Sequence, residues 1–358
     1  MILLTGFPGF IGERLLPRLV ELSPDPSFAC LVQERFLETA RRRIRAIEDR
    51  HPRARGRIAT VVGDIGLDRL GLDPGTARRL QDQVTGAWHL AAVYDLAVPR
   101  ELGQRVNVDG TRHVVQLLSQ ARRLDAFHYV STAYVSGTAA GVFRETDLDV
   151  GQSFKNHYEE TKFLAEVEVA RSGLPAAVYR PAIVVGDSRT GETAKFDGPY
   201  YIMAAMEKAP APGPFFRIGS GRHPANIVPV DFVIEALARL SALPESRGRT
   251  YHLTDPDPLS TFEVARLFAR ALGKRFVFLP VPKPVARALL SPGPVRRYFG
   301  LPLEALDYFD HSCVYDAAQA TAGLALLGIS CPRLPDYVDR LVAFFRAQRG
   351  QVRRDAMA

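Results

Sequence analysis

A tyrosine and a lysine lie four residues apart in the stretch HYEETKFLAE, where Tyr158 and Lys162 share one face of an expected helix. A tyrosine hydroxyl can donate a proton to a carbonyl oxygen as a hydride reaches the carbon, but its ordinary pKa of about 10 hinders exchange near neutral pH. A lysine ammonium one turn away lowers that pKa by stabilising the phenolate, and it can also bind ribose hydroxyls. The pair therefore predicts general-acid catalysis at a carbonyl group.

Three further polar side chains are placed to support this pair. Ser131 and Thr132 end an expected strand in YVSTAYVSG, where a hydroxyl can hold a substrate oxygen beside Tyr158. Asn107, in RVNVDGT, falls inside an expected helix, a position that asparagine disfavours. We predict that its amide supports a water molecule that relays protons to Lys162; a surface or capping role is the alternative.

The opening stretch LLTGFPGFIGERLL predicts a strand, a turn and a helix, with glycines at Gly6, Gly9 and Gly12. Gly6 and Gly9 can adopt backbone angles that are closed to other residues, and they let the main chain approach a pyrophosphate. A helix that begins near Phe10 and Ile11 directs its N-terminus toward that charge. The spacing predicts a cofactor-binding loop, and a glycine-rich turn without a ligand is the alternative.

The ends of two later strands favour the same cofactor. Asp64 and then Ile65 follow a strand in VVGDI, where the carboxylate of Asp64 can accept a hydrogen bond from an adenine amine. The fourth strand ends in HLAA, and Ala91 and Ala92 are small enough for a backbone that passes close to a cofactor. Since parallel strands end at one edge of a sheet, we expect these residues to share a crevice with the glycine loop.

The residues after the second strand bear on the choice between NADP(H) and NAD(H). A carboxylate there favours NAD, whereas a cation favours NADP. The stretch LVQERF offers Gln33, Glu34 and Arg35, and Arg42 or Arg43 follows within two helix turns. We predict NADP(H) in preference to NAD(H), with Arg35 and Arg43 near the 2′-phosphate.

Apolar, β-branched segments alternate with amphipathic segments through the first half of the chain. Strands are expected at 2–6, 28–32, 58–63, 86–92, 127–132 and 176–186, and helices at 11–22, 36–49, 105–122 and 158–172. Continuous apolar strands are typical of a parallel sheet that is covered on both faces. The alternation predicts an α/β fold with a Rossmann-type doubly wound parallel sheet.

The second half of the chain is richer in Gly, Pro and aromatic residues. We predict a dinucleotide-binding core formed by 1–186 together with 226–258. A smaller C-terminal substrate-binding lobe is expected from 187–225 and 259–358.

Substrate contacts are expected near the strand ends and in the aromatic stretches. Tyr94, just beyond HLAA, and Thr132 are expected to face the substrate. Tyr200 and Phe216 belong to a group of aromatic residues that could form an apolar acyl tunnel, or equally the core that joins the two parts. Arg217 could bind a phosphate.

Composition restricts the class of protein. The 358 residues are 47% hydrophobic and 24% charged, which is ordinary for a globular protein. The sequence predicts no membrane span, no secretory signal and, from the spacing of its three cysteines and eight histidines, no metal site. We therefore expect a cytoplasmic protein.

The formal charge of +7 is uneven, because residues 41–57 hold eight arginines. The simplest interpretation of this segment is a solvated helix and loop, and the alternative is a basic rim that attracts phosphates or an acidic carrier protein. Nucleic acid is disfavoured as a partner, since no aromatic residues lie between these arginines.

The motifs TGFPGFIG, HLAA, NVDGT, VSTAYV, YEETK and RPAIVVG resemble, in order and spacing over roughly 1–260, those of extended short-chain dehydrogenase/reductases. The resemblance implies a homodimer and a catalytic tetrad with Ser131 nearby, made of Asn107, Thr132, Tyr158 and Lys162. It also implies that the backbone after Arg180 meets the nicotinamide carboxamide, at Pro181, Ile183 and Val184.

Longer matches, such as VVGDSRTGETAKFDGPYY, resemble the branch that contains fatty acyl-CoA reductases, male-sterility proteins and thioester-reductase domains, with a MupV-like subgroup the most similar. This branch implies an NAD(P)-dependent oxidoreductase that transfers hydride to a carbonyl or acyl thioester of a hydrophobic substrate, fatty-acyl or polyketide-like, bound to CoA or an acyl carrier protein. Relatives usually read LVR where this chain reads LVQ at 31–33.

Other functions remain open at this stage. A sugar-nucleotide epimerase and a hydroxysteroid-type alcohol dehydrogenase share the superfamily, and a dinucleotide-sensing protein is the non-enzyme alternative. A dehydratase is disfavoured, because Ala133 and Tyr134 stand where dehydratases usually carry an acidic pair.

Overall fold

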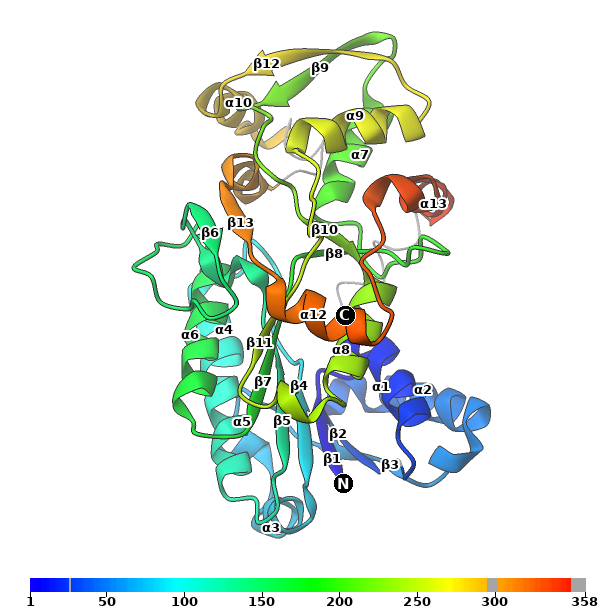
Figure 1. Ribbon diagram of the computed structural model, residues 1–358, viewed down its shortest axis with the longest axis vertical. Helices are drawn as coiled ribbons and strands as arrows, with labels where there is room; N and C mark the ends of the chain where they lie inside the picture. Colours follow the sequence, from blue (N-terminus) through cyan, green and yellow to red (C-terminus); the bar gives the residue numbers. More distant parts are fainter. Residues whose placement is uncertain (26, 295–301, 349–358) are drawn as a thin grey trace.

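A seven-stranded parallel sheet forms the centre of the molecule, whose computed structural model describes residues 1–25, 27–294 and 302–348 (Figure 1). The strands lie in the order β11-β7-β5-β4-β1-β2-β3. Their bounds are Ile2–Thr5 (β1), Phe28–Val32 (β2), Ile58–Val62 (β3), Gly86–His89 (β4), Ala126–Val130 (β5), Ala176–Pro181 (β7) and Thr250–Leu253 (β11). The strand order changes direction between β1 and β4, as in a doubly wound Rossmann sheet, and confirms the predicted fold class.

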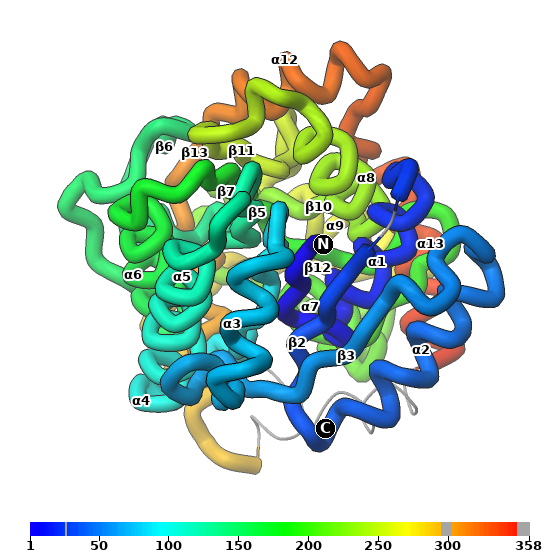
Figure 2. Tube along the Cα trace, turned by 90° about the horizontal axis from the view of Figure 1, so that it is seen from below, coloured from blue at the N-terminus to red at the C-terminus, as the bar shows by residue number. Residues whose placement is uncertain are grey.

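Helices cover both faces of this sheet, so all five residues of β2 are buried. Figure 2 shows α5 and α6 on one side and α1 and α2 on the other. The first layer packs side chains of α3, α5 and α6 onto the sheet, and the second packs those of α1, α2 and α8. Their bounds are Phe10–Leu22 (α1), Leu37–Arg50 (α2), Pro74–Gln83 (α3), Gly110–Ser119 (α5), His157–Arg171 (α6) and Val230–Leu240 (α8).

Two expected elements are divided in the structure. The strand expected at 176–186 is divided after Pro181: the Ala182 N–H still bonds the Leu253 carbonyl at the end of β11 (3.1 Å), but the next residues form β8 (Ile183–Val185), which pairs with β10 (Ile227–Pro229). The helix expected at 105–122 begins earlier, as α4 (Arg100–Gly103), and continues through a π-helical turn, η4 (Gln104–Asp109), into α5. Such turns often occur at functional sites.

The elements beyond the C-terminal edge of the sheet form a smaller lobe (Figure 1). Its main bounds are Pro199–Lys208 (α7), Gly213–Ile218 (β9), Thr261–Ala271 (α9), Phe276–Val281 (β12), Lys283–Leu290 (α10) and Leu334–Gln348 (α13). A short pair, β6 (Gly141–Phe143) and β13 (Cys313–Tyr315), joins this lobe to the segment after β5.

One late helix belongs spatially with the sheet. Ala320 and Leu324 of α12 (Ala318–Leu326) are buried in the same core cluster as α8 and β11. The division of the chain drawn from the sequence placed this helix in the lobe, and that division otherwise stays a prediction. Within the described residues, none of the helices has the length and apolarity needed to cross a membrane.

Candidate active site

The glycine loop, residues 6–12, winds around a single carbonyl oxygen. Gly6 has a φ of +84°, and the Gly9 N–H donates to the Gly6 carbonyl (3.0 Å). A Cβ would lie 2.8 Å from this oxygen at Gly9 and 2.5 Å at Gly12. A Cβ at Gly6 would lie 2.7 Å from the backbone of Leu90 and Ala91. The loop therefore excludes side chains at the start of α1, as a cradle for a dinucleotide pyrophosphate requires.

The other predicted cofactor residues lie around the same edge of the sheet. They are Phe10 and Ile11 at the start of α1, Ile65 after β3, Ala91 and Ala92 after β4, Pro181 at the end of β7, and Ile183 and Val184 in β8. The Ala91 N–H donates to the Thr5 hydroxyl (3.3 Å), which ties the chain after β4 to the end of β1.

A hydrogen-bonded chain of side chains joins the ends of β2 and β3. Gln33 Nε2 donates to Asp64 Oδ2 (2.8 Å), and Arg35 Nε donates to Gln33 Oε1 (2.8 Å). The Arg35 guanidinium also stacks on Phe36, with 4.6 Å from its carbon to the ring centroid. Arg43, in contrast, pairs with Glu13 of α1 (3.1 Å). Of the two arginines predicted for the 2′-phosphate, Arg35 thus lies beside Asp64 and Arg43 is held by a carboxylate.

Tyr158 and Thr132 meet at the end of β5. Tyr158 follows the start of α6, where the Asn156 side chain caps the helix by accepting the Glu159 N–H (3.0 Å). The side chain of Thr132 lies close enough to the Tyr158 hydroxyl to lower its pKa, but burial has the larger effect and raises that pKa well above its ordinary value. The tyrosine is therefore a protonated donor at neutral pH.

Lys162 lies one turn further along α6 and is 3% exposed. Its ammonium donates to the Val130 carbonyl (2.9 Å) and to the Tyr129 hydroxyl (3.0 Å). Burial lowers the pKa of Lys162 to about 8, and the carboxylate of Glu166 opposes this shift. The ammonium is thus anchored to the end of β5, directly before Ser131 and Thr132.

Asn107 and Ser131 form hydrogen bonds to the elements that surround the site, and their predicted roles stay predictions. The Asn107 amide accepts the Val93 N–H (2.9 Å) and donates to the Thr161 hydroxyl (3.0 Å), so it ties the chain after β4 to α6. The hydrogen bonds of this buried amide are therefore made with residues next to the site. The Lys162 ammonium does not bond Asn107 directly but donates to the Val130 carbonyl of β5. The Ser131 hydroxyl donates to Glu166, so its hydrogen bond is made with α6.

The residues predicted to contact the substrate lie in different parts of the structure. Tyr94 is 44% exposed and packs edge-on against Tyr158, with 5.1 Å between ring centroids. Tyr200 lies in the core of the lobe, where its hydroxyl accepts the Gly186 N–H (3.0 Å). Phe216 is 53% exposed and lines a cavity in the lobe. The aromatic group expected from the sequence is therefore partly core and partly pocket.

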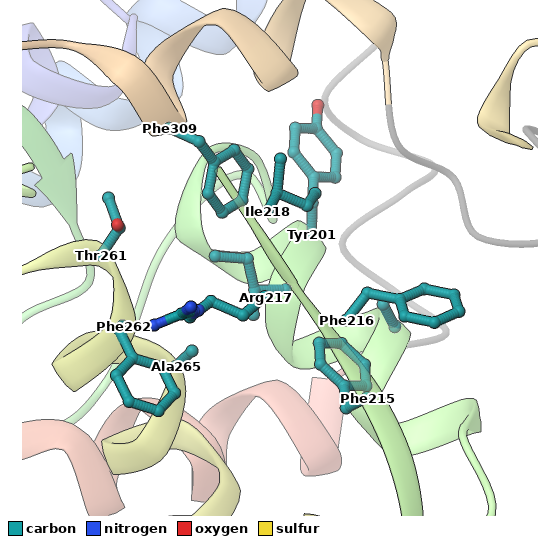
Figure 3. A pocket seen from close by; sticks show the side chains of 11 residues that line it. Tyr201, Phe215, Phe216, Arg217, Ile218, Thr261, Phe262, Ala265 and Phe309 are labelled. Atoms are coloured by element: carbon teal, nitrogen blue, oxygen red, sulfur yellow. The ribbon is translucent and has the colours of Figure 1, made fainter. Parts of the chain in front are cut away.

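The cavity lies between α7, β9 and α9 and measures about 70 Å³ (Figure 3). Its lining is mainly apolar and consists of Tyr201, Ile202, Ala205, Phe215, Phe216, Arg217, Ile218, Thr261, Phe262, Ala265 and Phe309. The Arg217 guanidinium lies 5.3 Å from the centroid of the Phe262 ring. An apolar pocket with few polar groups is typical of a site for a hydrophobic ligand.

Sequence reasoning missed two buried polar features. His89 bridges the hydroxyls of Thr5 (2.7 Å) and Thr111 (3.0 Å), and burial lowers its pKa to about 3, so it is neutral. Glu166 forms an ion pair with Arg180 behind Lys162. The spacing of Tyr158, Lys162 and Glu166, each four residues apart, was visible in the sequence and could have identified the second feature.

Among the residues that the structure describes, no group of three or more His, Cys, Asp or Glu side chains is arranged to hold a metal ion.

The model of the male sterility protein family, an NAD-binding domain, matches residues 4–237. The chain belongs to this family. It is 30% identical over 272 residues to a polypeptide of the linear gramicidin synthase of Brevibacillus parabrevis, in a match that covers 71% of this chain and 5% of that protein. It is 29% identical over 285 residues to carboxylic acid reductase of Mycobacterium tuberculosis, in a match that covers 71% of this chain and 24% of that protein. The chain therefore spans a quarter or less of the length of these relatives.

Solved structures support the same assignment. The terminal R domain from the myxalamid PKS-NRPS biosynthetic pathway is 28% identical, with a TM-score of 0.82 over 97% of this chain and 90% of that one. A thiolation-reductase di-domain from an archaeal non-ribosomal peptide synthetase shares the fold, with 20% identity and a TM-score of 0.74 over 97% of this chain and 75% of that one. The predicted branch is confirmed, and this family member is an NAD(P)-dependent oxidoreductase of the reductase-domain type.

Proposed function

We propose that this reductase reduces the acyl thioester of a hydrophobic substrate, or a carbonyl compound derived from one, with NADPH as the hydride donor. The observation that carries the proposal is the meeting of Thr132 and Tyr158 at the sheet edge that also holds the glycine loop. The relatives that are reductases support the reaction class. The test is to supply acyl-CoA and NADPH and to measure aldehyde and free thiol, which should form in equal amounts.

Each residue of the site has a defined part in this reaction. A nicotinamide cofactor, when bound at the glycine loop, would supply the hydride for the carbonyl carbon. Thr132 holds the carbonyl oxygen by a hydrogen bond, and Tyr158 donates its proton to that oxygen as negative charge develops. We assign to Lys162, one turn further along α6 and held by Val130 and Tyr129, the stabilisation of the resulting phenolate. The hemithioacetal hydroxyl then returns its proton to the Tyr158 phenolate while the C–S bond breaks, so that the aldehyde carbonyl forms and the thiolate leaves and takes a proton from the solvent.

The preference for NADPH rests on Arg35. Gln33 and Phe36 hold its guanidinium beside Asp64, where we place the adenine ribose. Replacing Arg35 with alanine should raise the KM for NADPH about tenfold or more, because a charge-assisted hydrogen bond to phosphate is lost. The KM for NADH should change little. Steady-state kinetics with both cofactors check this, and an equal change for both would contradict the assignment.

A matched control for Arg35 lies on α2. Arg41 is also exposed, and its ion pair with Glu38 keeps it within its own helix (2.9 Å). Replacing Arg41 with alanine should leave both cofactor constants unchanged, which would exclude a general effect of lost positive charge.

We assign the far end of a long acyl chain to the cavity in the lobe, whose volume of about 70 Å³ holds only a few CH2 groups. Tyr201 lines this cavity, and the ring of Tyr94 packs on Tyr158. We place the acyl chain along these residues, from the proton donor toward the cavity. The fold shared with a thiolation-reductase di-domain supports a substrate carried as a thioester on a carrier protein or CoA.

Filling the cavity tests this assignment. Replacing Ala265 with leucine adds three carbon atoms to the cavity of about 70 Å³. We expect kcat/KM for dodecanoyl-CoA to fall about tenfold and that for butanoyl-CoA to stay near wild type. The control replaces Ala322, an exposed residue of α12, with leucine. An unchanged dependence on chain length in the Ala265 variant would exclude this cavity as the acyl site.

A further inference from the structure

A buried ion pair lies directly behind the catalytic residues. Glu166 and Arg180 are both about 2% exposed in their side chains, and Arg180 Nε donates to Glu166 Oε1 (2.9 Å). The other carboxylate oxygen of Glu166 accepts the hydroxyl of Ser131, the residue before Thr132. A buried ion pair by itself is weak evidence for stability, so its place beside the site needs another explanation.

The pair is part of a larger network that reaches the C-terminal part of the chain. Arg180 Nη1 donates to His252 Nε2 (3.1 Å), and His252 Nδ1 donates to the Asp316 carbonyl (2.7 Å). Burial lowers the pKa of His252 to about 3, so the ring is neutral and can accept at Nε2 and donate at Nδ1. Arg180 is therefore held on two sides, and its guanidinium is a fixed partner for Glu166.

The Glu145 carboxylate anchors the far end of this network. It accepts the backbone N–H groups of His252 (2.9 Å), Gln319 (2.6 Å) and Ala320 (3.0 Å). Gln319 and Ala320 lie in the first turn of α12, where a carboxylate is favoured by the helix dipole. Three segments that are distant in sequence thus hold Arg180 and Glu166 in place.

The titratable groups around Lys162 show which of them affects its charge. His89 from β4 is neutral, as described above, and Tyr129 from β5 is neutral because burial raises its pKa. Tyr158 and Glu166 lie four residues before and after Lys162 on the same face of α6. Within the described chain, Glu166 is the carboxylate whose field raises the pKa of the buried Lys162.

We propose that Glu166 is a positioning residue that holds the Ser131–Thr132 end of β5 against α6 and keeps Lys162 protonated beside Tyr158. This inference rests on the proposed function for the roles of Thr132, Tyr158 and Lys162. Arg180 balances the charge of Glu166, and the network behind it prevents the carboxylate from turning away from Ser131.

Replacing Glu166 with glutamine tests the electrostatic part. The amide has the shape of the carboxylate, and Ser131 can keep its hydrogen bond by accepting from the new NH2 group. We expect the alkaline limb of the kcat/KM profile to move to lower pH by about one unit, because Lys162 loses its proton more readily. Equal loss of activity at every pH, or no change, would overturn the proposal.

Glu168 provides the matched control on the same helix. It pairs with Arg112 at the surface (2.8 Å), and its replacement by glutamine should leave the pH profile at the wild-type position. Ser131→Ala separates the two roles of Glu166. It should lower kcat severalfold, because the end of β5 loses its tie to α6, and it should leave the alkaline limb in place.

Two further measurements keep the proposal falsifiable. If Glu166→Gln does not fold because Arg180 is left unpaired, the double variant E166Q/R180Q removes both charges and should show the same direction of shift. The pH dependence of NADPH binding, measured by fluorescence, reports the protonation of Lys162 in the absence of a thioester. A wild-type protein that binds NADPH but reduces no thioester would contradict the proposed function, whereas unshifted binding in Glu166→Gln would contradict this inference alone.

Discussion

Replacement of Tyr158 with phenylalanine is expected to lower kcat by a factor of about 10² to 10⁴, the range for loss of a positioned general acid. The ring can keep its edge-on packing against Tyr94, so binding of substrate should change much less than turnover. Because burial raises the pKa of Tyr158, the wild-type hydroxyl is fully protonated at neutral pH, and phenylalanine has no proton to donate in its place. The rate of NADPH oxidation with an acyl-CoA measures the effect.

Tyr337 offers a control of the same chemical change. Among the described residues its buried hydroxyl has no hydrogen-bond partner, so Tyr337→Phe should leave both turnover and stability near wild type. Turnover of Tyr158→Phe within a few fold of wild type would remove Tyr158 from the mechanism. A parallel loss of kcat in both variants would indicate a general effect of removing a buried hydroxyl.

The sequence predicted the sheet, and the edge of the sheet where the candidate site lies, because both follow from local patterns of residue types. The apolar strands and the small or polar residues that follow them, such as Gly6, Asp64 and Thr132, are recognisable without knowledge of any partner. Parallel strands that alternate with helices must end at one edge, so residues far apart in sequence could be placed together. The family resemblance, confirmed by the family match, added the order of the motifs.

The direction of individual side chains could not be predicted in the same way. Ser131 and Thr132 are adjacent residues that directly follow β5, and nothing local in the sequence shows that the Ser131 hydroxyl turns to Glu166 of α6. Arg43 has Glu13 as a partner thirty residues away, which no periodicity reveals. These outcomes depend on pairings between elements, and a single sequence does not encode those pairings in any local pattern.

The lobe was the least predictable part for a related reason. Its strands β9 and β12 lie far apart in the chain, and their aromatic residues fit a strand and a pocket lining equally well. Tyr200 and Tyr201 are adjacent in sequence, yet Tyr200 lies in the core and Tyr201 lines the cavity. The two residues are identical in type, but successive residues of a helix such as α7 point in different directions.

Replacement of Gly6 with alanine should have the second large effect, on both stability and cofactor binding. The φ of +84° is strained for alanine, and the new Cβ would lie 2.7 Å from the backbone of Leu90 and Ala91. Those backbone atoms cannot move freely, because β4 pairs with β1 and the Ala91 N–H is bound to Thr5. We expect the free energy of unfolding to fall by about 4 kcal/mol or more, a size reserved for such specific clashes.

Gly56 separates backbone strain from steric overlap. Its φ is +70°, close to that of Gly6, but a Cβ there would meet no atom within 4 Å. Gly56→Ala should therefore cost only the strain, about 1–2 kcal/mol, and leave NADPH binding unchanged. Urea unfolding and a fluorescence titration with NADPH compare the two variants. Similar losses in both would mean that the approach of β4 to Gly6 is not what shapes the cradle, because the left-handed backbone alone would then explain the effect.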